Sequence, residues 1–111
     1  MKLQIGEGFE GQEMFVIPRP ILADARLHPL VRGLFPTDIG WYPAARYHYR
    51  DRVNGAPEDH LMMCLDGHGY VVVNDKKSHL QAGELIIIPR NTPHTYWAAE
   101  DNPWSIYWMH F

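Results

Sequence analysis

The sequence is poor in several features that would have pointed to particular classes of protein. It has a single cysteine, Cys64, so no internal disulfide can form and a reducing, cytoplasmic setting fits best. No uninterrupted apolar run approaches the ~20 residues that a helix needs to cross a bilayer. The formal net charge is -3, and acidic and basic residues are interspersed, which leaves no basic stripe to bind a phosphate backbone. These absences argue against a disulfide scaffold, a membrane span and a nucleic-acid surface.

What the sequence does contain is an ordinary globular composition with many rings. Its 111 residues suit one domain with one core, and 46% hydrophobic with 21% charged residues are typical of a protein that folds. Four Trp, six Tyr and seven His are many for this length. Such side chains fill cores, but they also line pockets for small molecules, because they combine a flat apolar face with a directed polar atom.

The order of residue types divides the chain into an N-terminal arm, residues 1–30, and a β-rich domain, residues 31–111. The arm is rich in Gly and Pro around a short apolar stretch, Met14 to Ile17, which must cover some other surface. From Leu34 onward, short segments of period two alternate with turn residues, which is typical of a β-sandwich or barrel with little helix. The expected strands are 34–42, 45–52, 59–66, 69–74, 77–81, 84–89, 94–99 and 104–111.

One corner of this pattern is distinctive. Between Gly83 and His94 the chain has a glycine turn, an apolar strand, Pro89, a tight turn through Asn91, and a histidine that opens the next strand. Asn tolerates a left-handed backbone better than other non-glycine residues, so Asn91 can close the turn. The segment resembles the second sequence motif of cupin barrels, in which a glycine usually occupies the position of Asn91.

Most of the remaining chain resembles the N-terminal sensor domain of AraC-type transcriptional regulators. The segments that carry the resemblance are Tyr42 to Ala45 with His48 and Arg52, Asn54-Gly55, Leu61 to Tyr70, Gly83 to His94, and Asn102 to Phe111. The resemblance implies an all-β fold, a cupin-like double-stranded β-helix (jelly-roll barrel) with an N-terminal arm, which binds a small effector and often a sugar.

The same resemblance sets expectations for the rest of the regulator. In this family the sensor is followed by dimerisation helices and a double helix-turn-helix domain, and neither is found in this sequence. Contact with DNA would therefore be made only by the missing C-terminal domain, and a homodimer of this fragment is left open. In sugar-responsive members the N-terminal arm folds over the occupied pocket, and residues 1–30 have a suitable composition.

On the expected strand 45–52, four basic side chains share one face: Arg46, His48, Arg50 and Arg52. Charge alone favours a solvated surface, since buried guanidinium groups are costly without partners. The resemblance implies a pocket role for two of them. Arg52 aligns with the pocket arginine of an arabinose-binding member, and His48 lies two positions away on the same face. Arg46 and Arg50 are expected on the surface.

The last two strands supply the other candidate ligand-binding residues. Trp108 aligns with a tryptophan that stacks on the sugar in that relative, and Tyr96 aligns with a pocket tyrosine. Ile106 replaces a polar pocket residue, which argues against arabinose itself. His94 and His110 are further candidates at the pocket or its rim. Both faces of strand 104–111 are apolar enough to predict burial on both sides.

A metal-dependent cupin enzyme acting on a sugar or small metabolite is the main alternative. In such enzymes the first motif supplies His-x-His followed by Glu, but here Leu61 and Met63 occupy the histidine positions. His94 alone cannot hold a catalytic metal, which needs about three protein ligands. Cys64 lies in an apolar run and is expected to be an inert core residue. The sequence therefore predicts an effector-sensing domain rather than an enzyme, with no cofactor. A third hypothesis is an oligomerisation surface with a vestigial pocket.

Overall fold

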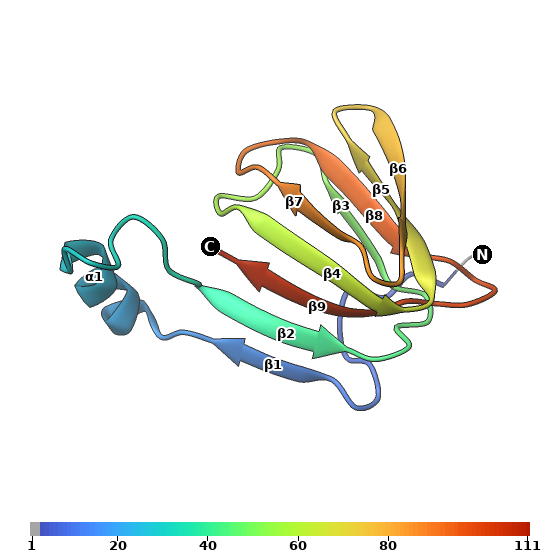
Figure 1. Cartoon of the computed structure of the whole chain (residues 1–111), viewed down its shortest axis with the longest axis horizontal. Coiled ribbons are helices and arrows are strands. Elements are labelled where there is room, and N and C mark those ends of the chain that lie inside the picture. Colours follow the sequence, from blue (N-terminus) through green and yellow to red (C-terminus); the bar gives the residue numbers. More distant parts are fainter. Residues whose placement is uncertain (1–2) are drawn as a thin grey trace.

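The computed structural model describes residues 3–111 as two antiparallel β-sheets that face each other, with one short helix set apart (Figure 1). The five-stranded sheet has the order β1-β2-β9-β4-β7 and the four-stranded sheet the order β3-β8-β5-β6. The strands are β1 (Glu13–Val16), β2 (Asp38–Tyr42), β3 (Tyr49–Arg52), β4 (His60–Asp66), β5 (His68–Val73), β6 (Lys76–Gln81), β7 (Leu85–Ile88), β8 (His94–Ala98) and β9 (Ser105–His110). The helix is α1 (Arg19–Leu27).

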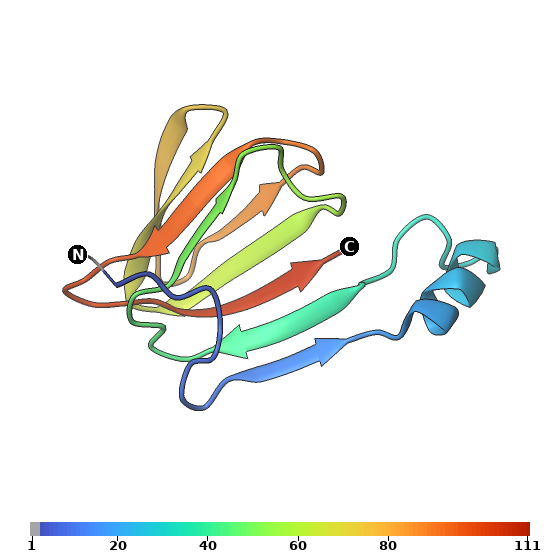
Figure 2. The same cartoon turned by 180° about the vertical axis from the view of Figure 1, so that it is seen from behind.

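At most steps along the chain, successive strands lie in different sheets, as the predicted jelly-roll requires. β4 and β9 pair in one sheet, β5 and β8 pair in the other, and the chain crosses between the sheets after β2, β3, β4, β6, β7 and β8. Seen from behind, β3 and β8 form one wall and β2 and β9 the other (Figure 2). The strands predicted from residue 59 onward are all present, with bounds that differ by one or two residues.

The core lies between the sheets and takes alternate residues from β2, β4, β5, β8 and β9. Met62, Val71, Ile88, Trp104 and Ile106 are fully buried there. Cys64 is buried with them, and burial raises the pKa of its thiol, which agrees with an inert core residue. The hydrophobic effect over these side chains holds the sheets together, at roughly 25 cal/mol for each Å² of apolar surface removed from water.

The outer face of the five-stranded sheet is largely uncovered, which corrects one prediction. The outward residues of the last strand were expected to be buried, but Tyr107 is 46% exposed. Ile39 of β2, Met63 of β4 and Ile87 of β7, in the same sheet, are exposed too. The sequence pattern was apolar on both sides, yet within residues 3–111 no layer covers this face.

The predicted turns have the left-handed backbone that their residue types suggested. Asn91 has φ = 56°, so it replaces the usual glycine of this corner as expected. Asn74 and Asp75 have φ = 49° and 66° and join β5 to β6 as a two-residue hairpin. Gly55 and Gly67 also have positive φ values at the predicted turns.

Two strands are shorter than predicted, at their N-terminal ends. Residues 45–48 are not part of β3, because Tyr47 takes a left-handed φ of 68° and the chain turns there. Residues 34–37 form a loop before β2. The alternation of side chains still places His48 on the inner face, since it continues the register of β3.

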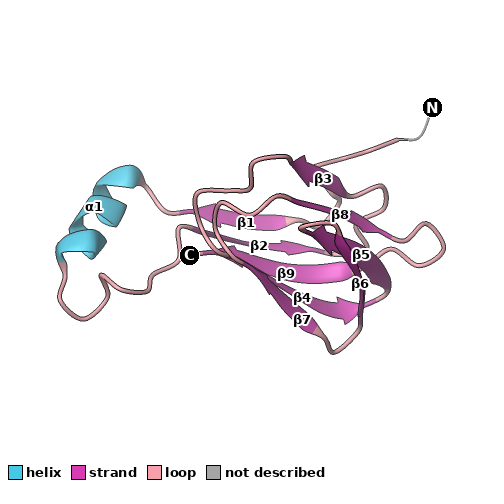
Figure 3. Ribbon diagram, turned by 90° about the horizontal axis from the view of Figure 1, so that it is seen from above, coloured by secondary structure: helices cyan, strands magenta, loops and turns pink. Residues whose placement is uncertain are grey.

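The N-terminal part has more regular structure than its composition indicated. β1 adds an edge strand to β2, pairing Phe15 with Ile39. Residue Ile5 forms an isolated bridge with His48, so the segment before β1 crosses the end of the barrel. Helix α1 starts after Pro18 and projects away from both sheets, and none of its residues is buried (Figure 3). It is too short to span a bilayer, and no helix within residues 3–111 is long and apolar enough to do so.

Candidate functional site

A cavity of about 280 Å³ opens between the two sheets, beneath the N-terminal segment. At ~30 Å³ for each water molecule, this is room for roughly nine waters, or for a small organic molecule. Its walls come from the arm and from both sheets. The lining residues are Gly6, Glu7, Met14, Asp38, Tyr42, His48, Arg50, Arg52, His60, Tyr96, Ile106, Trp108 and His110.

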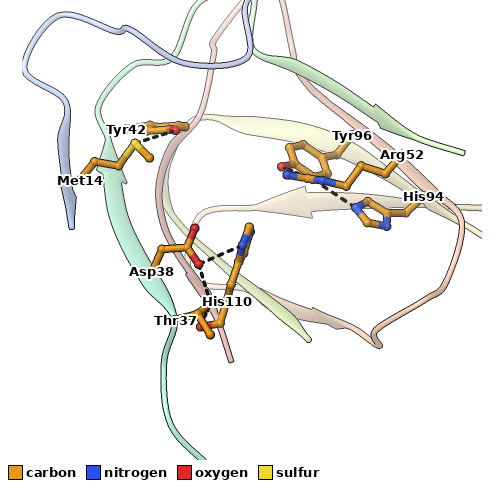
Figure 4. A network of polar contacts seen from close by, with 8 residues as sticks. All are labelled: Met14, Thr37, Asp38, Tyr42, Arg52, His94, Tyr96 and His110. Carbon is orange, nitrogen blue, oxygen red and sulfur yellow. Dashed lines mark hydrogen bonds and ion pairs between the residues drawn. The ribbon is translucent and has the colours of Figure 1, made fainter. Parts of the chain in front are cut away.

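Arg52 and Tyr96 form the polar centre of the four-stranded wall. The Arg52 Nη1 donates to the Tyr96 hydroxyl at 2.9 Å, and its Cζ lies 5.7 Å from the centre of the Tyr96 ring (Figure 4). Burial raises the pKa of Tyr96, while the adjacent guanidinium lowers it by a smaller amount. The phenol therefore stays neutral and offers its own O–H to a guest in the cavity.

His94 holds Arg52 from behind rather than lining the cavity. Its Nδ1 lies 2.9 Å from the Thr92 carbonyl oxygen, which can only accept, so Nδ1 carries the proton. Nε2 then accepts from Arg52 Nη1 at 3.3 Å (Figure 4). Burial lowers the pKa of His94, and the Arg52 charge lowers it further. This neutral imidazole is oriented to fix the guanidinium.

His48 is held as one tautomer by a buried tryptophan. The Trp104 indole N–H donates to His48 Nδ1 at 3.0 Å, and because an indole nitrogen is a donor only, Nδ1 must be unprotonated. Burial, with help from the nearby Arg50 and Arg52 charges, lowers the pKa of His48 to about 3. The neutral ring therefore carries its proton on Nε2 and provides a hydrogen-bond donor at the cavity wall.

His60 has a buried ring nitrogen without a partner among the described residues. It is 2% exposed, and its Nδ1 has no hydrogen-bond partner within residues 3–111. Burial lowers the pKa of His60 to about 2, and the neighbouring His110 ring, whose centre is 4.3 Å away, adds to the effect. Buried polar atoms are rarely left unpaired in proteins, so this nitrogen is available to a guest or to water.

Trp108 forms the aromatic wall opposite Arg52. Its indole lies against the backbone of Gly40, where a Cβ atom would overlap Cε2 and Cζ2 of the ring. Its Nε1 is buried without a partner at hydrogen-bond geometry among the described residues, although Trp108 is close enough to lower the pKa of Tyr42 slightly. Burial dominates there and raises the pKa of Tyr42 to about 12. A flat ring with a free N–H suits a hydroxylated guest.

A second polar cluster lies on the five-stranded wall, across the opening from Arg52 (Figure 4). Asp38 accepts from the Thr37 hydroxyl at 2.6 Å and lies 3.2 Å from His110 Nδ1. Burial lowers the pKa of His110, against the opposing effect of the Asp38 charge. Asp38 and Tyr42 were not among the candidates, although their alternation on one strand, with Gly40 between them, placed them on the face of the pocket.

Arg50 was expected on the surface, and that expectation was wrong. It lines the cavity beside Arg52, because alternation along β3 turns His48, Arg50 and Arg52 to the same inner face. The arm packs closely on it, since a Cβ built on Gly6 would lie 2.9 Å from Arg50 Cζ. Arg46 is exposed, as predicted.

Five of the six predicted ligand-binding residues thus meet at one cavity: His48, Arg52, Tyr96, Trp108 and His110. His94 contacts Arg52 but is not in the wall. Within the part of the chain that the structure describes, no group of three or more His, Cys, Asp or Glu side chains is arranged to hold a metal ion.

Comparison with known proteins identifies the family. The model of the AraC-like ligand binding domain matches residues 42–111. The chain belongs to this family. Residues of the family domain therefore include β3 to β9 and most of the cavity wall.

Two curated proteins related to the chain are operon regulators. The MmsAB operon regulatory protein of Pseudomonas aeruginosa is 33% identical over 99 residues, which cover 85% of this chain and 32% of that protein. The raffinose operon regulatory protein of Pediococcus pentosaceus is 36% identical over 47 residues, covering 41% of this chain and 17% of that protein. The chain thus spans about a third or less of the length of these regulators.

Solved structures confirm the cupin fold. A cupin protein from Bacteroides fragilis superposes with a TM-score of 0.56 at 21% identity, covering 70% of this chain and 67% of its own. A cupin superfamily protein from Desulfitobacterium hafniense gives a TM-score of 0.58 at 12% identity, covering 96% and 83%. At these identities the likeness concerns the fold. The AraC-like family match is what makes effector sensing the function class.

Proposed function

We infer that this domain senses a small hydroxylated metabolite, a sugar or a close relative of one, in the cavity between its sheets. This proposal rests on the different chemical groups that the two facing walls of the cavity present. Arg52 and Tyr96 present donors on one side, and the unpartnered Trp108 indole lies on the other. Pockets that bind small molecules combine such apolar rings with a few fixed polar atoms.

Each residue of the cavity has its own role in binding the guest. Arg52 and the Nε2–H of His48 donate to hydroxyl or ring oxygens of the guest, and Trp108 packs against its C–H face. Asp38 accepts from a hydroxyl on the opposite wall, next to His110. His94 is a positioning residue, since it acts on the guest only through Arg52. With most of these groups already held in place, little conformational entropy is lost on binding.

The arm supplies a route from the occupied cavity to the rest of the regulator. Gly6, Glu7 and Met14 line the cavity, so the arm contacts any guest directly. Ile5 is tied to the barrel through its bridge with His48, a pocket residue. A guest that touches both the arm and the barrel favours the closed arm over the open one, which is all that regulation requires. In the whole, cytoplasmic protein the arm would then alter contacts made by a C-terminal DNA-binding domain.

A thermal-shift screen of monosaccharides, followed by calorimetry on the compounds that raise the melting temperature, tests this function. At least one compound is expected to bind, and Arg52→Gln is expected to weaken it about tenfold or more by removing charge-assisted hydrogen bonds. Arg46→Gln is the matched control, because Arg46 is exposed and outside the cavity. If no sugar or related small molecule binds, or if both variants bind like the parent protein, the proposed function is wrong.

A further inference from the structure

The cavity contains two guanidinium groups with no carboxylate partner. Arg50 and Arg52 come from one strand, face the same way and line the same wall. Among residues 3–111 neither forms an ion pair, and Arg50 makes no side-chain hydrogen bond. Both are only partly exposed. Two partly buried cations side by side repel each other and lose hydration, so an anion between them would relieve both costs.

Two acidic residues also line the cavity, and neither neutralises this pair. The Asp38 carboxylate is on the opposite sheet, where it is already matched with the Thr37 hydroxyl and with His110. Glu7 is exposed on the arm and forms no ion pair with either arginine. The nearby histidines add no charge of their own, since burial holds the pKa of His48 at about 3 and that of His60 at about 2. The excess positive charge is therefore local to the β3 wall.

We propose that the effector is an acid: a hydroxylated carboxylate of monosaccharide size, such as a sugar acid. Its carboxylate lies at Arg50 and Arg52, and its hydroxyl groups reach Asp38 and His110 on the far wall. Planar guanidinium groups match the two oxygens of a carboxylate in a way that a single hydroxyl cannot. The inference rests on the proposed function and names the chemical class that the same cavity prefers.

The cavity has a polar cluster at each end, and the two clusters differ in chemistry. Figure 4 shows Arg52 with Tyr96 and His94 on one side of the opening, and Asp38 with His110 on the other. A neutral sugar would satisfy the second cluster but leave both guanidinium groups without a countercharge. A hydroxy acid has a different group for each end, and the Trp108 ring in the wall of the same cavity can pack against its carbon chain.

Calorimetric titration with matched compounds tests the charge directly. Galacturonate, its methyl ester and galactose share the same pyranose ring and ring hydroxyl groups and differ only at C6, as do glucuronate, its methyl ester and glucose. The acid is expected to bind at least about tenfold more tightly than the ester or the neutral sugar, as charge-assisted hydrogen bonds predict. Arg50→Gln should lower the ratio of acid to ester affinity several-fold, and the remaining preference should come from Arg52. Arg50→Lys should keep part of the preference, because it retains the charge without the planar fork.

Two control variants separate the charge at Arg50 from general effects. Arg46→Gln changes the net charge equally from an exposed position and should leave the acid preference intact. Glu7→Gln removes the negative charge at the cavity rim and should strengthen binding of the acid more than that of the ester. Far-ultraviolet circular dichroism and the melting temperature of each variant show whether it is folded.

The outcomes distinguish this inference from the proposed function. Neutral sugars that bind as tightly as their acids, or an acid preference that is unchanged by Arg50→Gln in a folded variant, would overturn the acidic effector and leave sugar sensing in place. Failure of acids, esters and neutral sugars alike would contradict the proposed function itself.

Discussion

The indole of Trp108 rests on the backbone of Gly40, two residues paired across β2 and β9, and this contact sets the depth of the cavity. A Cβ atom at position 40 would overlap the ring, so any side chain there would displace it. The wall opposite the arginines is therefore determined by a residue that has no side chain.

Gly40→Ala should destabilise the protein and obstruct the cavity, because the added methyl group overlaps the Trp108 ring. Overpacking of this kind costs about 1–3 kcal/mol in the free energy of unfolding, which urea denaturation can measure. Gly33→Ala is the control, since nothing lies within 4 Å of a Cβ there and no positive φ is required. Equal stability of the two variants would mean that the Trp108 contact does not constrain the fold.

His94→Ala should weaken effector binding through the loss of an acceptor for Arg52, although His94 does not line the cavity. Removing one buried partner of a charged group costs about 1–3 kcal/mol. His94→Gln should recover part of the affinity, since its amide can donate to the Thr92 carbonyl and accept from Arg52. Calorimetry on both variants checks this, and an affinity that His94→Gln fails to improve over His94→Ala would argue against positioning.

Trp104→Phe should release the tautomer of His48. In the parent protein the indole N–H requires an unprotonated Nδ1, so the ring nitrogen spectrum of labelled histidine should show the Nε2–H form for His48. Without the indole, the two tautomers should become mixed, and stability should fall by about 1–3 kcal/mol for the unsatisfied buried nitrogen. Observing an Nδ1–H form in the parent protein would contradict the assignment.

Acid should destabilise the domain through its buried histidines. His48 and His60 have folded-state pKa values of about 3 and about 2, well below 6.5, so between these limits the unfolded chain binds more protons than the folded one. The stability they provide is complete above pH 6.5 and is lost as the pH falls, at about 1.4 kcal/mol per pH unit for each histidine.

Urea titrations between pH 6.5 and 4.5 measure this slope. Burial also lowers the pKa values of His94 and His110, so they act in the same direction. His60→Gln should reduce the slope by about 1.4 kcal/mol per pH unit, which corresponds to one proton fewer taken up on unfolding. An unchanged slope in that variant would show that His60 is not kept neutral by burial. The window avoids Asp59, whose pKa the adjacent Arg90 already holds below its usual value.

The C-terminal half of the fold could be predicted because local signals there agree. From residue 59 onward the strands are short segments, and as far as β8 they are separated by Asn, Asp and Gly at left-handed turns. Strand β1 and helix α1 were not predicted, because each is short. β1 is stabilised by its pairing with β2, which is a tertiary contact. Prolines such as those at the start of α1 are as common in turns as at helix starts. β3 is shorter than predicted because Tyr47 has a positive φ. A tyrosine rarely adopts that conformation, so nothing in the sequence indicated it.

The site residues that were predicted are those that the family resemblance supplied. The residues that were missed could be found only from the three-dimensional arrangement of the strands. Arg52, Tyr96 and Trp108 meet at the cavity from strands far apart in the sequence. Arg50 was assigned to the surface although it shares a face with Arg52, because buried guanidinium groups are costly. His60 and Asp38 contribute through the register of β4 and β2 with β9, which is a tertiary property.

The indole N–H signals of the four tryptophans provide the most direct test of the central claim, that a small hydroxylated guest lies between Arg52 and Trp108. The strongest binder from the sugar and sugar-acid series is titrated into labelled protein, with Trp108→Phe assigning the signal. We predict that the Trp108 signal shifts with the calorimetric saturation curve, because its buried N–H gains a partner. Trp41, which packs on Tyr107 at the outer face, should not move. A saturating compound that leaves the Trp108 signal in place would contradict the account.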